Sequence, residues 1–406
     1  MVEIPRIISV DDHVIEPASV WQDRLPQRYR DRGPRLVRVF GRIEPQIGGY
    51  RVVEDPDAPG ARWADEWRYD DLQMVIPAGM AQVHQLRNEH YHEPVTYDEM
   101  APGVHTQSAR LADMDLNHVE AALCFPTVPR FCGQTFLERE DKDLALLCVQ
   151  AYNDWMIDEW CGGAGRGRLI PLTLIPLWDV ELAAAEVGRC AAKGSNAIAF
   201  SEGPPYLGLP SIHSGYWNPL WEACEETGSV VNMHIGSSST WPNTGPDAPS
   251  LVPKALSFQN AQVAFTDWLA SGLFEKYPTL RIALSEGQVG WIPFVAGRLD
   301  NEWELGDLFE KDIKSRLPQP PSSYIDGRVY GCIFDDLSGL RARDQIGMSQ
   351  IMFETDYPHG DTSFPESKLM AEKLVTAAGL SEQETYQLIR GNAIEVYDLK
   401  RWGIDR

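Results

Sequence analysis

The residues that first suggest chemistry stand together near the N-terminus. A short apolar run over residues 7–10 is followed directly by Asp11, Asp12 and His13. Because alternate residues of a β-strand point to the same side, Asp11 and His13 project together and Asp12 projects to the other face. A carboxylate and an imidazole side by side at the end of a strand can begin a metal site. The alternative is a strand that runs into a polar, solvated turn, so the rest of the chain must supply further ligands.

Later apolar runs end in the same residue types. Three of them end at His234, Glu286 and Asp356, and Glu202 stands just past a fourth. Taken with the N-terminal pair, the two imidazoles and two of these carboxylates suit a divalent ion of the zinc, manganese or iron type. They contain too much nitrogen for magnesium or calcium to be the first choice. We therefore expect one divalent transition metal, with zinc as the first candidate and iron or manganese as the others.

The elements that must position these residues alternate between strands and helices. Eight apolar runs are separated by helical segments, at residues 7–13, 119–126, 169–176, 196–201, 229–234, 280–286, 328–334 and 351–356. Continuous apolar runs are typical of parallel strands that are covered on both faces. We expect an α/β fold, specifically a (β/α)8 TIM barrel, in which the carboxyl ends of the strands meet at one face. An open doubly wound sheet is the alternative, but no glycine-rich phosphate loop follows any strand.

A long segment after the first strand interrupts this alternation. Residues 27–110 are rich in arginine, aspartate, proline and aromatic residues. A segment of this length is usually functional or has structure of its own. We expect an inserted cap made of a small hairpin and loops, between a first strand and loop at 1–26 and the remaining barrel at 111–406. The histidines of this cap are expected to lie on a solvated surface: His84, His90, His92 and His105.

The composition limits the partners and the compartment. The chain has 406 residues, 59 acidic against 36 basic, and a net charge of −23, which repels nucleic acid and anionic membranes. No apolar run approaches the roughly 18 residues of a transmembrane helix, and the N-terminus lacks a signal-peptide pattern. Seven cysteines without a C-x-x-C pair argue against a disulfide framework and for the cytoplasm. We expect a small-molecule substrate, no nucleic-acid or membrane partner, and leave a homo-oligomer open.

These motifs together resemble a known family. The chain is similar to the amidohydrolase superfamily, specifically the amidohydrolase-2 branch that contains aminocarboxymuconate-semialdehyde decarboxylase and related non-oxidative decarboxylases. The resemblance covers about residues 5–20 and 110–400. It rests on five pieces: Asp11-x-His13-x-x-Glu16-Pro17, Asn232-Met233-His234, Ser285-Glu286-Gly287, Glu354-Thr355-Asp356-Tyr357-Pro358-His359 and Arg390-Gly391-Asn392-Ala393.

The resemblance implies a site for one metal ion. The ion would be held by a pair from the first strand, a histidine from the fifth and an aspartate from the eighth: Asp11, His13, His234 and Asp356. The chain departs from the family pattern at two points. Glu286 stands where the family often has a histidine, and no lysine stands near Glu202, where many binuclear relatives have a carbamylated one. We expect Glu202 to support the site, and a bridging role for its carboxylate is the less favoured alternative.

The expected chemistry follows from a metal-bound water. A bound metal lowers the pKa of its water to about 7 and polarises a substrate oxygen. Asp356 would act as ligand and general base, and Glu286 or His359 would pass the proton to the leaving group. We expect Glu16 and Arg298 to support the ligands. An added ligand role is left open for Glu286, and its pairing with a nearby arginine such as Arg298 is the alternative to both functional roles.

Hydrolysis of an amide, ester or thioester in a medium-sized organic substrate is the leading functional prediction. It leads because the long insertion can cover a bulky substrate, and because Glu286 replaces the usual histidine. The alternative within the family is metal-dependent, non-oxidative decarboxylation of an aromatic or unsaturated carboxylic acid, in which the metal chelates the carboxylate and a neighbouring hydroxyl. The alternative of another class is a non-catalytic small-molecule-binding barrel, which predicts that one of the four ligands is displaced from the site.

Overall fold

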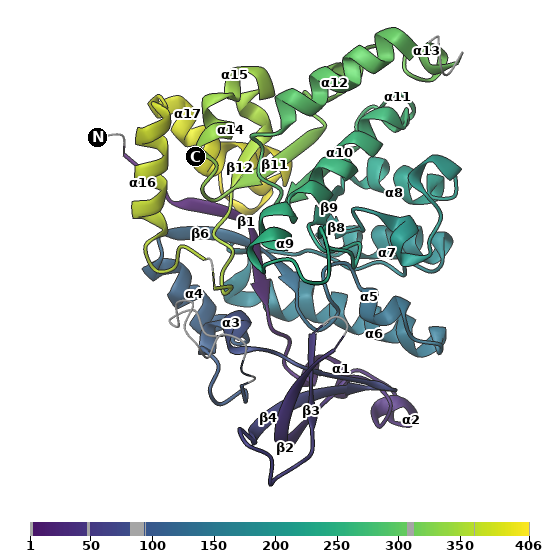
Figure 1. The fold of residues 1–406 in the computed structure, drawn as a ribbon, viewed down its shortest axis with the longest axis vertical. Coiled ribbons are helices and arrows are strands. Elements are labelled where there is room, and N and C mark those ends of the chain that lie inside the picture. The colour runs from purple at the N-terminus through teal and green to yellow at the C-terminus, as the bar shows by residue number, and fades with distance from the viewer. Residues whose placement is uncertain are drawn as a thin grey trace.

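The computed structural model describes residues 3–46, 49–81, 93, 95–306, 312–360 and 362–405. The fold is mixed α/β (Figure 1), and eight parallel strands form two of its sheets. Three strands lie in the order β1-β6-β7 and five in the order β12-β11-β10-β9-β8. They are β1 (Ile7–Val14), β6 (Val119–Pro126), β7 (Leu169–Ile170), β8 (Ala197–Ala199), β9 (Val230–His234), β10 (Arg281–Ser285), β11 (Val329–Ile333) and β12 (Ile351–Phe353).

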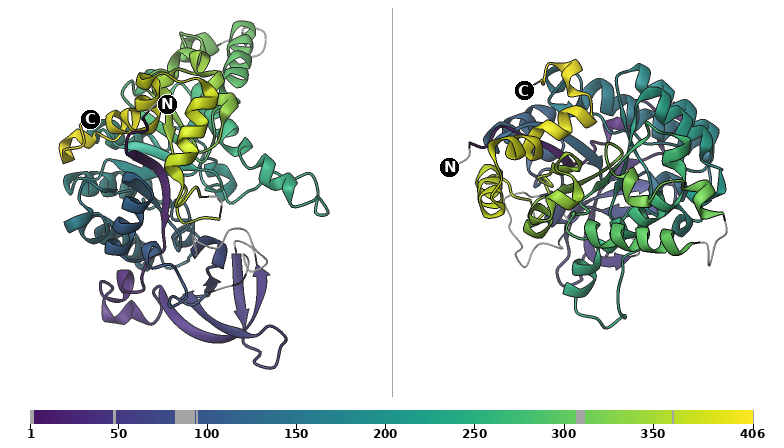
Figure 2. Two further views of the ribbon diagram at one scale, coloured as in Figure 1. Left: turned by 90° about the vertical axis from the view of Figure 1, so that its left-hand side faces the viewer. Right: turned by 90° about the horizontal axis from the view of Figure 1, so that it is seen from above.

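Helices pack around the outside of these strands, as the view from above in Figure 2 shows. The longer helices are α4 (Gln107–Leu116), α6 (Lys142–Trp155), α7 (Val180–Ala192), α8 (Asn218–Thr227), α10 (Gln259–Ala270), α12 (Ile292–Leu305) and α16 (Ser367–Ala378). The shorter ones are α1 (Ser19–Gln22), α2 (Gln27–Arg30), α3 (Ala78–Ala81), α5 (Gln134–Leu137), α9 (Leu251–Leu256), α11 (Leu273–Lys276), α13 (Ile313–Arg316), α14 (Leu337–Arg341), α15 (Arg343–Ile346), α17 (Glu382–Tyr386) and α18 (Asn392–Val396). None of the helices in the described ranges has the length and apolar character needed to cross a bilayer.

Local sequence explains where these helices begin and end. The carboxylate of Asp179 accepts hydrogen bonds from the backbone N–H groups of Glu181 and Leu182, and so caps the first turn of α7. Helix α8 ends at Gly228, whose φ of 68° lies in the left-handed region that glycine adopts at little cost. The glycine therefore turns the chain out of α8 and into β9.

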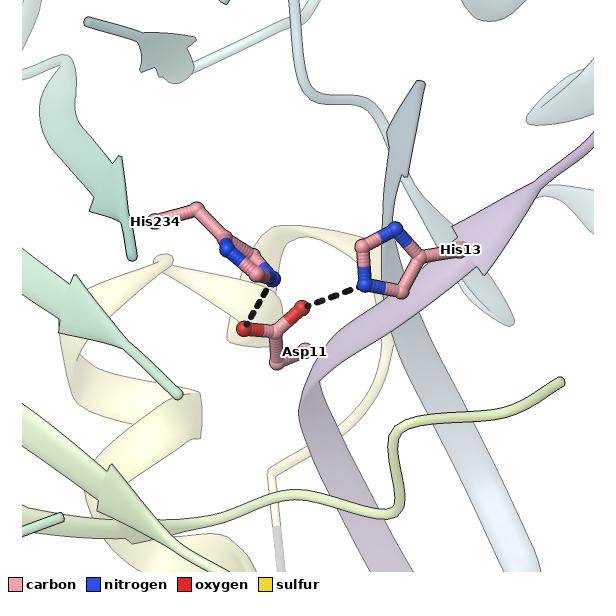
Figure 3. A group of neighbouring side chains, drawn as sticks. All are labelled: Asp11, His13 and His234. Carbon is pink, nitrogen blue, oxygen red and sulfur yellow. Dashed lines mark ion pairs between the residues drawn. The ribbon is translucent and has the colours of Figure 1, made fainter. Parts of the chain in front are cut away.

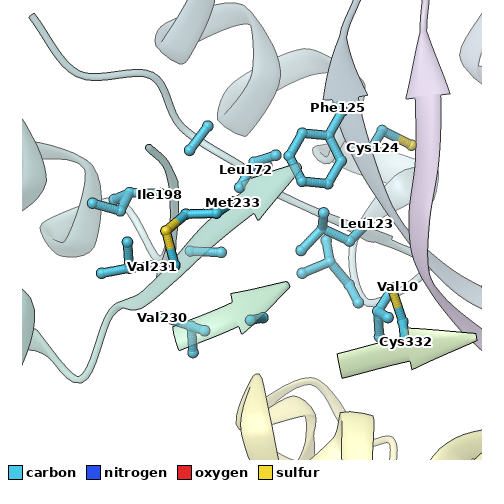
Figure 4. Close-up of a cluster of buried hydrophobic side chains, with 14 of the residues drawn as sticks. Val10, Leu123, Cys124, Phe125, Leu172, Ile198, Val230, Val231, Met233 and Cys332 are labelled. Carbon is cyan, nitrogen blue, oxygen red and sulfur yellow. The ribbon is translucent and has the colours of Figure 1, made fainter. Parts of the chain in front are cut away.

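The strands are apolar because they are covered on both faces. Every residue of β1, β9 and β11 is buried. Figure 4 shows Val10, Leu123, Met233 and Cys332, from four different strands, in one cluster of buried side chains. Parallel strands buried on both faces must be apolar throughout. The polar residues near the ends of β1 and β9 are therefore exceptions that need an explanation.

Backbone hydrogen bonds join the two sheets at both pairs of edges. Between β7 and β8, the backbone N–H of Thr173 donates to Ala197 O over 3.0 Å, and that of Ala199 donates to Thr173 O over 2.9 Å. Between β12 and β1, the N–H of Asp356 donates to Asp11 O over 3.0 Å. The pairing residues Thr173 and Asp356 lie just beyond the ends of β7 and β12.

The chain between β1 and β6 contains more strands than the hairpin expected from the sequence. A closed, four-stranded antiparallel barrel has the order β2-β3-β5-β4. Its strands are β2 (Arg35–Gln46), β3 (Gly49–Val53), β4 (Arg62–Tyr69) and β5 (Leu72–Val75). A Cβ at Gly41 would stand 2.1 Å from Val53 O, so only glycine lets β2 and β3 approach at that point. Of the cap histidines, His105 is half-buried against Tyr97, whereas His84, His90 and His92 lie outside the described residues.

Candidate metal centre

Three buried side chains from two strands converge at the end of β1. Asp11 and His13 project from the same face of β1, and His234 is the last residue of β9. His13 Nε2 lies 3.6 Å from Asp11 Oδ1, and His234 Nε2 lies 3.5 Å from Asp11 Oδ2. Figure 3 shows the two carboxylate oxygens of Asp11 directed toward the two imidazoles. Their ligand atoms lie close enough together to hold one metal ion.

Asp356 and His359 approach the same centre from the segment after β12. His13 Nε2 lies 3.3 Å from Asp356 Oδ1, and His359 Nδ1 lies 2.9 Å from the same oxygen. The rings of His13 and His359 lie with their centroids 3.8 Å apart. Asp356 has a φ of 50°, which turns the chain directly after the strand. The structure thus brings together all four residues that the sequence nominated as ligands.

The donor atoms of this cluster fit a cation. The carboxylate oxygens of Asp11 and Asp356 and the Nε2 atoms of His13 and His234 are buried and have no hydrogen-bond partner among the described residues. Buried polar atoms without partners are costly, and a divalent ion would satisfy all of them at once. His234 Nδ1 lies 2.6 Å from Ile235 O, a contact that directs Nε2 toward the cluster.

The pKa shifts within the cluster also favour a bound cation. Burial raises the pKa of Asp11 well above its usual value, and the neighbouring carboxylates of Glu354 and Asp356 raise it further. Burial is also the largest cause that lowers the pKa values of His13 and His234 well below the usual value for histidine. Both imidazoles are therefore neutral, which is the form that binds metals. A bound cation would offset the repulsion among the carboxylates.

Glu286 stands at the edge of this cluster, after β10. Its Oε2 lies 3.4 Å from His234 Nε2. The backbone N–H of Glu286 donates to Cys332 Sγ over 3.3 Å and to Glu354 Oε2 over 3.2 Å. Asp11, Cys332 and Glu354 form a second buried group of ligand types, which sequence reasoning missed because the thiol lies within an apolar strand. Cys332 Sγ donates to Glu354 Oε2 over 2.5 Å, so these two side chains satisfy one another.

Glu16 and Glu202 bind loops, and neither belongs to the groups of ligand types that converge in the described residues. Glu16 accepts hydrogen bonds from the backbone N–H groups of Thr127 and Val128, and so ties the end of β1 to the loop after β6. Glu202 Oε1 accepts bonds from Gly236 N–H, at 2.8 Å, and from the Asn260 side chain, at 2.9 Å. Its carboxylate therefore organises the loop after β9.

Arg298 pairs with Glu302, and not with Glu286 as the alternative for that carboxylate proposed. It lies on α12 with an exposed side chain and forms its ion pair with Glu302, one helical turn along. Residues four apart on a helix are surface neighbours, so Glu302 is the local partner. The closeness of Arg298 to Glu286 in the sequence does not indicate which face of α12 carries the arginine.

Two buried residues that sequence reasoning did not select hold the ligands in place. Asp12 Oδ1 accepts hydrogen bonds from Ser9 Oγ at 2.8 Å and from Thr355 Oγ1 at 2.7 Å. Arg110 is fully buried and donates to the backbone carbonyl of His13. Its guanidinium lies over the ring of Tyr357, 4.1 Å from the centroid. The alternation of the first strand places Asp12 opposite the ligands, but its neighbours there come from distant parts of the chain.

Comparisons with known proteins agree on the family. The family model described as "Amidohydrolase" matches residues 67–399. The gamma-resorcylate decarboxylase of Rhodococcus jostii (strain RHA1) is 25% identical over 353 residues, which cover 77% of this chain and 98% of that protein. An amidohydrolase of Mycobacterium avium subsp. paratuberculosis K-10 has a similar crystal structure, with a TM-score of 0.68, 20% identity and coverage of 97% and 99% of the two chains. The dihydroxybenzoic acid decarboxylase of Polaromonas sp. JS666, with bound manganese and the inhibitor 2-nitroresorcinol, has a TM-score of 0.59, 17% identity and coverage of 98% of both chains.

These comparisons contradict the predicted hydrolysis. The gamma-resorcylate decarboxylase, which is matched over 98% of its length, is a decarboxylase, as the alternative within the family predicted. The hydrolase prediction failed because the same ligands serve both reactions, and neither the long insertion nor Glu286 distinguishes them. The manganese of the Polaromonas enzyme and the cluster described above support a divalent metal, but they do not support zinc as its first candidate.

Proposed function

The chain belongs to the amidohydrolase family, and from this premise we propose that it is a metal-dependent, non-oxidative decarboxylase. Its substrate would be an aromatic carboxylic acid with a hydroxyl group next to the carboxylate, the feature shared by the substrates named for its relatives. The observation that carries the proposal is the convergence of four buried side chains whose ligand atoms lack hydrogen-bond partners within the part of the chain that the structure describes.

We infer that the eight parallel strands act as one (β/α)8 barrel, because hydrogen bonds bridge both pairs of sheet edges. The small barrel of β2–β5 would then belong to an insertion at residues 27–110. This insertion would separate the first strand and its loop, at residues 1–26, from the remaining barrel at residues 111–406. In this arrangement the carboxyl ends of β1, β9, β10 and β12 share one face. That face carries all the residues proposed for metal binding and catalysis.

Asp11, His13, His234 and Asp356 are the residues that would hold the metal. Manganese is our first candidate, with iron and zinc after it, because the structurally similar Polaromonas enzyme binds manganese. When bound, the metal would bind the substrate carboxylate and its neighbouring hydroxyl oxygen and offset their negative charge. The chain itself must then orient the ring and deliver one proton.

The reaction breaks the bond between the ring carbon and the carboxylate carbon. Carbon dioxide leaves, the electron pair stays on the ring carbon, and a proton from an acid replaces the carboxylate. We assign this acid to Asp356, because His359 Nδ1 lies 2.9 Å from its Oδ1 and can share a proton with it. Glu286 is the second candidate for the acid, because its Oε2 lies 3.4 Å from His234 at the edge of the same cluster.

A non-catalytic binding barrel is disfavoured by the geometry. That alternative predicts that one of the four ligands is displaced from the site. Asp11, His13, His234 and Asp356 instead form a continuous chain of contacts of 3.3 to 3.6 Å. A barrel that only bound small molecules would have no need of four buried polar groups in this arrangement.

The proposal is tested by following carbon dioxide. The purified chain is loaded with manganese and incubated with 2,6-dihydroxybenzoate and related hydroxybenzoates. We expect carbon dioxide release, and in D2O we expect one deuterium on the ring carbon that lost the carboxylate. Removal of the metal by dialysis against a chelator should abolish release, and added manganese should restore it. Metal-loaded protein that releases no carbon dioxide from any of these acids would contradict the proposal.

A further inference from the structure

One aromatic side chain stands beside the metal-binding cluster, and a second approaches it from another loop. Phe131, in the loop after β6, stacks on the ring of His234, with centroids 4.3 Å apart and planes 21° from parallel. Trp241 lies in the loop after β9, seven residues beyond His234. Its side chain is 51% exposed, whereas Phe131 is half-buried. An exposed tryptophan in the loop after β9 is unusual, because burial of an indole is strongly favourable.

Gly236 brings these two rings together. Its φ is 86°, in the left-handed region that favours glycine. A Cβ at this position would stand 2.7 Å from the indole of Trp241 and 3.0 Å from the ring of Phe131. The bare backbone of Gly236 therefore lies between the two rings, and any side chain there would push at least one of them away. Phe131, Gly236 and Trp241 form a continuous surface, which we call the aromatic wall.

Buried hydrogen bonds hold the two loops of the aromatic wall in place. Glu202 Oε1 accepts from the backbone N–H of Gly236 at 2.8 Å and from Ser238 Oγ at 2.9 Å. Gln134 Nε2 donates to the carbonyl of Ser237 at 3.1 Å, and so links the loop after β9 to the loop that carries Phe131. This network accounts for Glu202, which the metal cluster does not use. Loops held this firmly are suited to positioning a ligand.

We infer that the aromatic wall is the subsite for the ring of the substrate, and that Phe131 and Trp241 determine its specificity for aromatic acids. The inference rests on the proposed function for the identity of the ligand. The metal cluster would bind the carboxylate and hydroxyl oxygens, and the wall beside His234 supplies the apolar faces that a planar ring needs. Aromatic rings stack with a preference that aliphatic ligands do not share. Glu202 is then a positioning residue, because it acts through Gly236 and Ser238.

The test compares a ligand that has a ring with one that has none. Calorimetry on the full, manganese-loaded chain measures the Kd of 2-nitroresorcinol, which is aromatic, and of malonate, which offers oxygen ligands alone. Phe131→Leu and Trp241→Ala should each weaken 2-nitroresorcinol binding about tenfold. Neither should change the Kd of malonate or the metal content. Phe294→Ala is the matched control, because Phe294 is an exposed aromatic residue on α12, and it should alter neither Kd.

The outcomes separate this inference from the proposed function. If both variants bind 2-nitroresorcinol as tightly as the wild type, or if the wild type binds malonate and not 2-nitroresorcinol, the aromatic wall is not a ring subsite. If both ligands weaken to the same degree, the variants have damaged the metal cluster and the inference fails. Ring-dependent binding by a wild-type protein that releases no carbon dioxide would support the subsite and contradict the decarboxylase.

Discussion

Asp12 and Thr355 are separated by 343 positions in the sequence and are joined by a buried hydrogen bond of 2.7 Å between Oγ1 and Oδ1. This bond ties the end of β1 to the residues after β12. Asp11 and His13 flank one partner, and Asp356 follows the other directly. The relative placement of the proposed ligands from the first and last strands therefore depends on two side chains that do not bind the metal.

Thr355→Val should loosen this connection. The substitution removes the hydroxyl, keeps the branched shape and leaves Asp12 short of a buried donor. We expect the free energy of unfolding to fall by about 1–3 kcal/mol and manganese binding to weaken about tenfold or more, as measured by urea titration and calorimetry. Thr385→Val is the matched control, because Thr385 is equally buried and its hydroxyl has no hydrogen-bond partner in the described ranges. Equal losses in the two variants would show that the bond to Asp12 has no special effect.

Asp356→Asn should remove activity and leave the fold intact. The amide cannot donate a proton to the ring carbon, so we expect the rate of carbon dioxide release to fall at least about a hundredfold. Glu286→Gln should reduce the rate much less if Asp356 is the acid. Circular dichroism and urea unfolding should show folded protein in both cases. Turnover retained in Asp356→Asn and lost in Glu286→Gln would exchange the two roles.

Metal analysis should find about one equivalent of a divalent ion in the purified chain. His234→Ala removes one of the four proposed ligands and should lower this content severalfold. Cys332→Ser should leave it unchanged, because the thiol is satisfied by its bond to Glu354. Two equivalents in the wild type and one in Cys332→Ser would instead place a second ion between Asp11, Cys332 and Glu354.

Glu16 should make stability depend on pH. Burial, the largest cause, raises its pKa to about 8, partly offset by the hydrogen bonds from Val128 and Thr127. A carboxyl whose pKa is higher in the folded than in the unfolded state stabilises the protein below the unfolded pKa of about 4.3. That stability is lost as the pH rises toward and through about 8.

Glu16→Gln removes the titrating proton, so a comparison of the two proteins isolates this effect. Between about pH 5 and pH 8 the wild type should lose about 1.4 kcal/mol per pH unit relative to the variant. Urea unfolding at each pH measures the difference. A constant difference across this range would show that Glu16 is ionised in the folded protein throughout.

The convergence of the site residues could be predicted because parallel strands place their carboxyl ends at the same edge. Once His234 and Asp356 are placed at the ends of apolar runs, parallel strands bring their side chains to the same edge as Asp11 and His13. The direction of Asp12 also followed from strand alternation. These inferences needed only the period of a strand and the parallel arrangement.

The remaining features depend on contacts that the sequence does not display. Arg110 is buried because distant residues such as Tyr357 and the carbonyl of His13 surround it, and nothing nearby in the sequence marks it as buried. The sequence predicted a hairpin in the insertion, but strand β4 was missed because Asp65 and Glu66 interrupt its apolar pattern although both are buried. The reaction was mistaken for a different reason, since metal ligands define which chemistry is available and not which bond is broken.

The small barrel of β2–β5 has consequences for how such chains can be recombined. The chain enters the small barrel after β1 and returns from it before β6, and these two strands are neighbours in one sheet. Replacing the small barrel would therefore leave the hydrogen bonds between β1 and β6 intact. Among the described residues, its own interior contains four buried apolar side chains, Val39, Val52, Ala64 and Val75, too few for an independent fold. Trp67 and Tyr69 of β4 pack into the main core instead. A replacement segment from a related protein would be tolerated if it carried aromatic residues at the positions of Trp67 and Tyr69, whatever residues it carried on its outer surface.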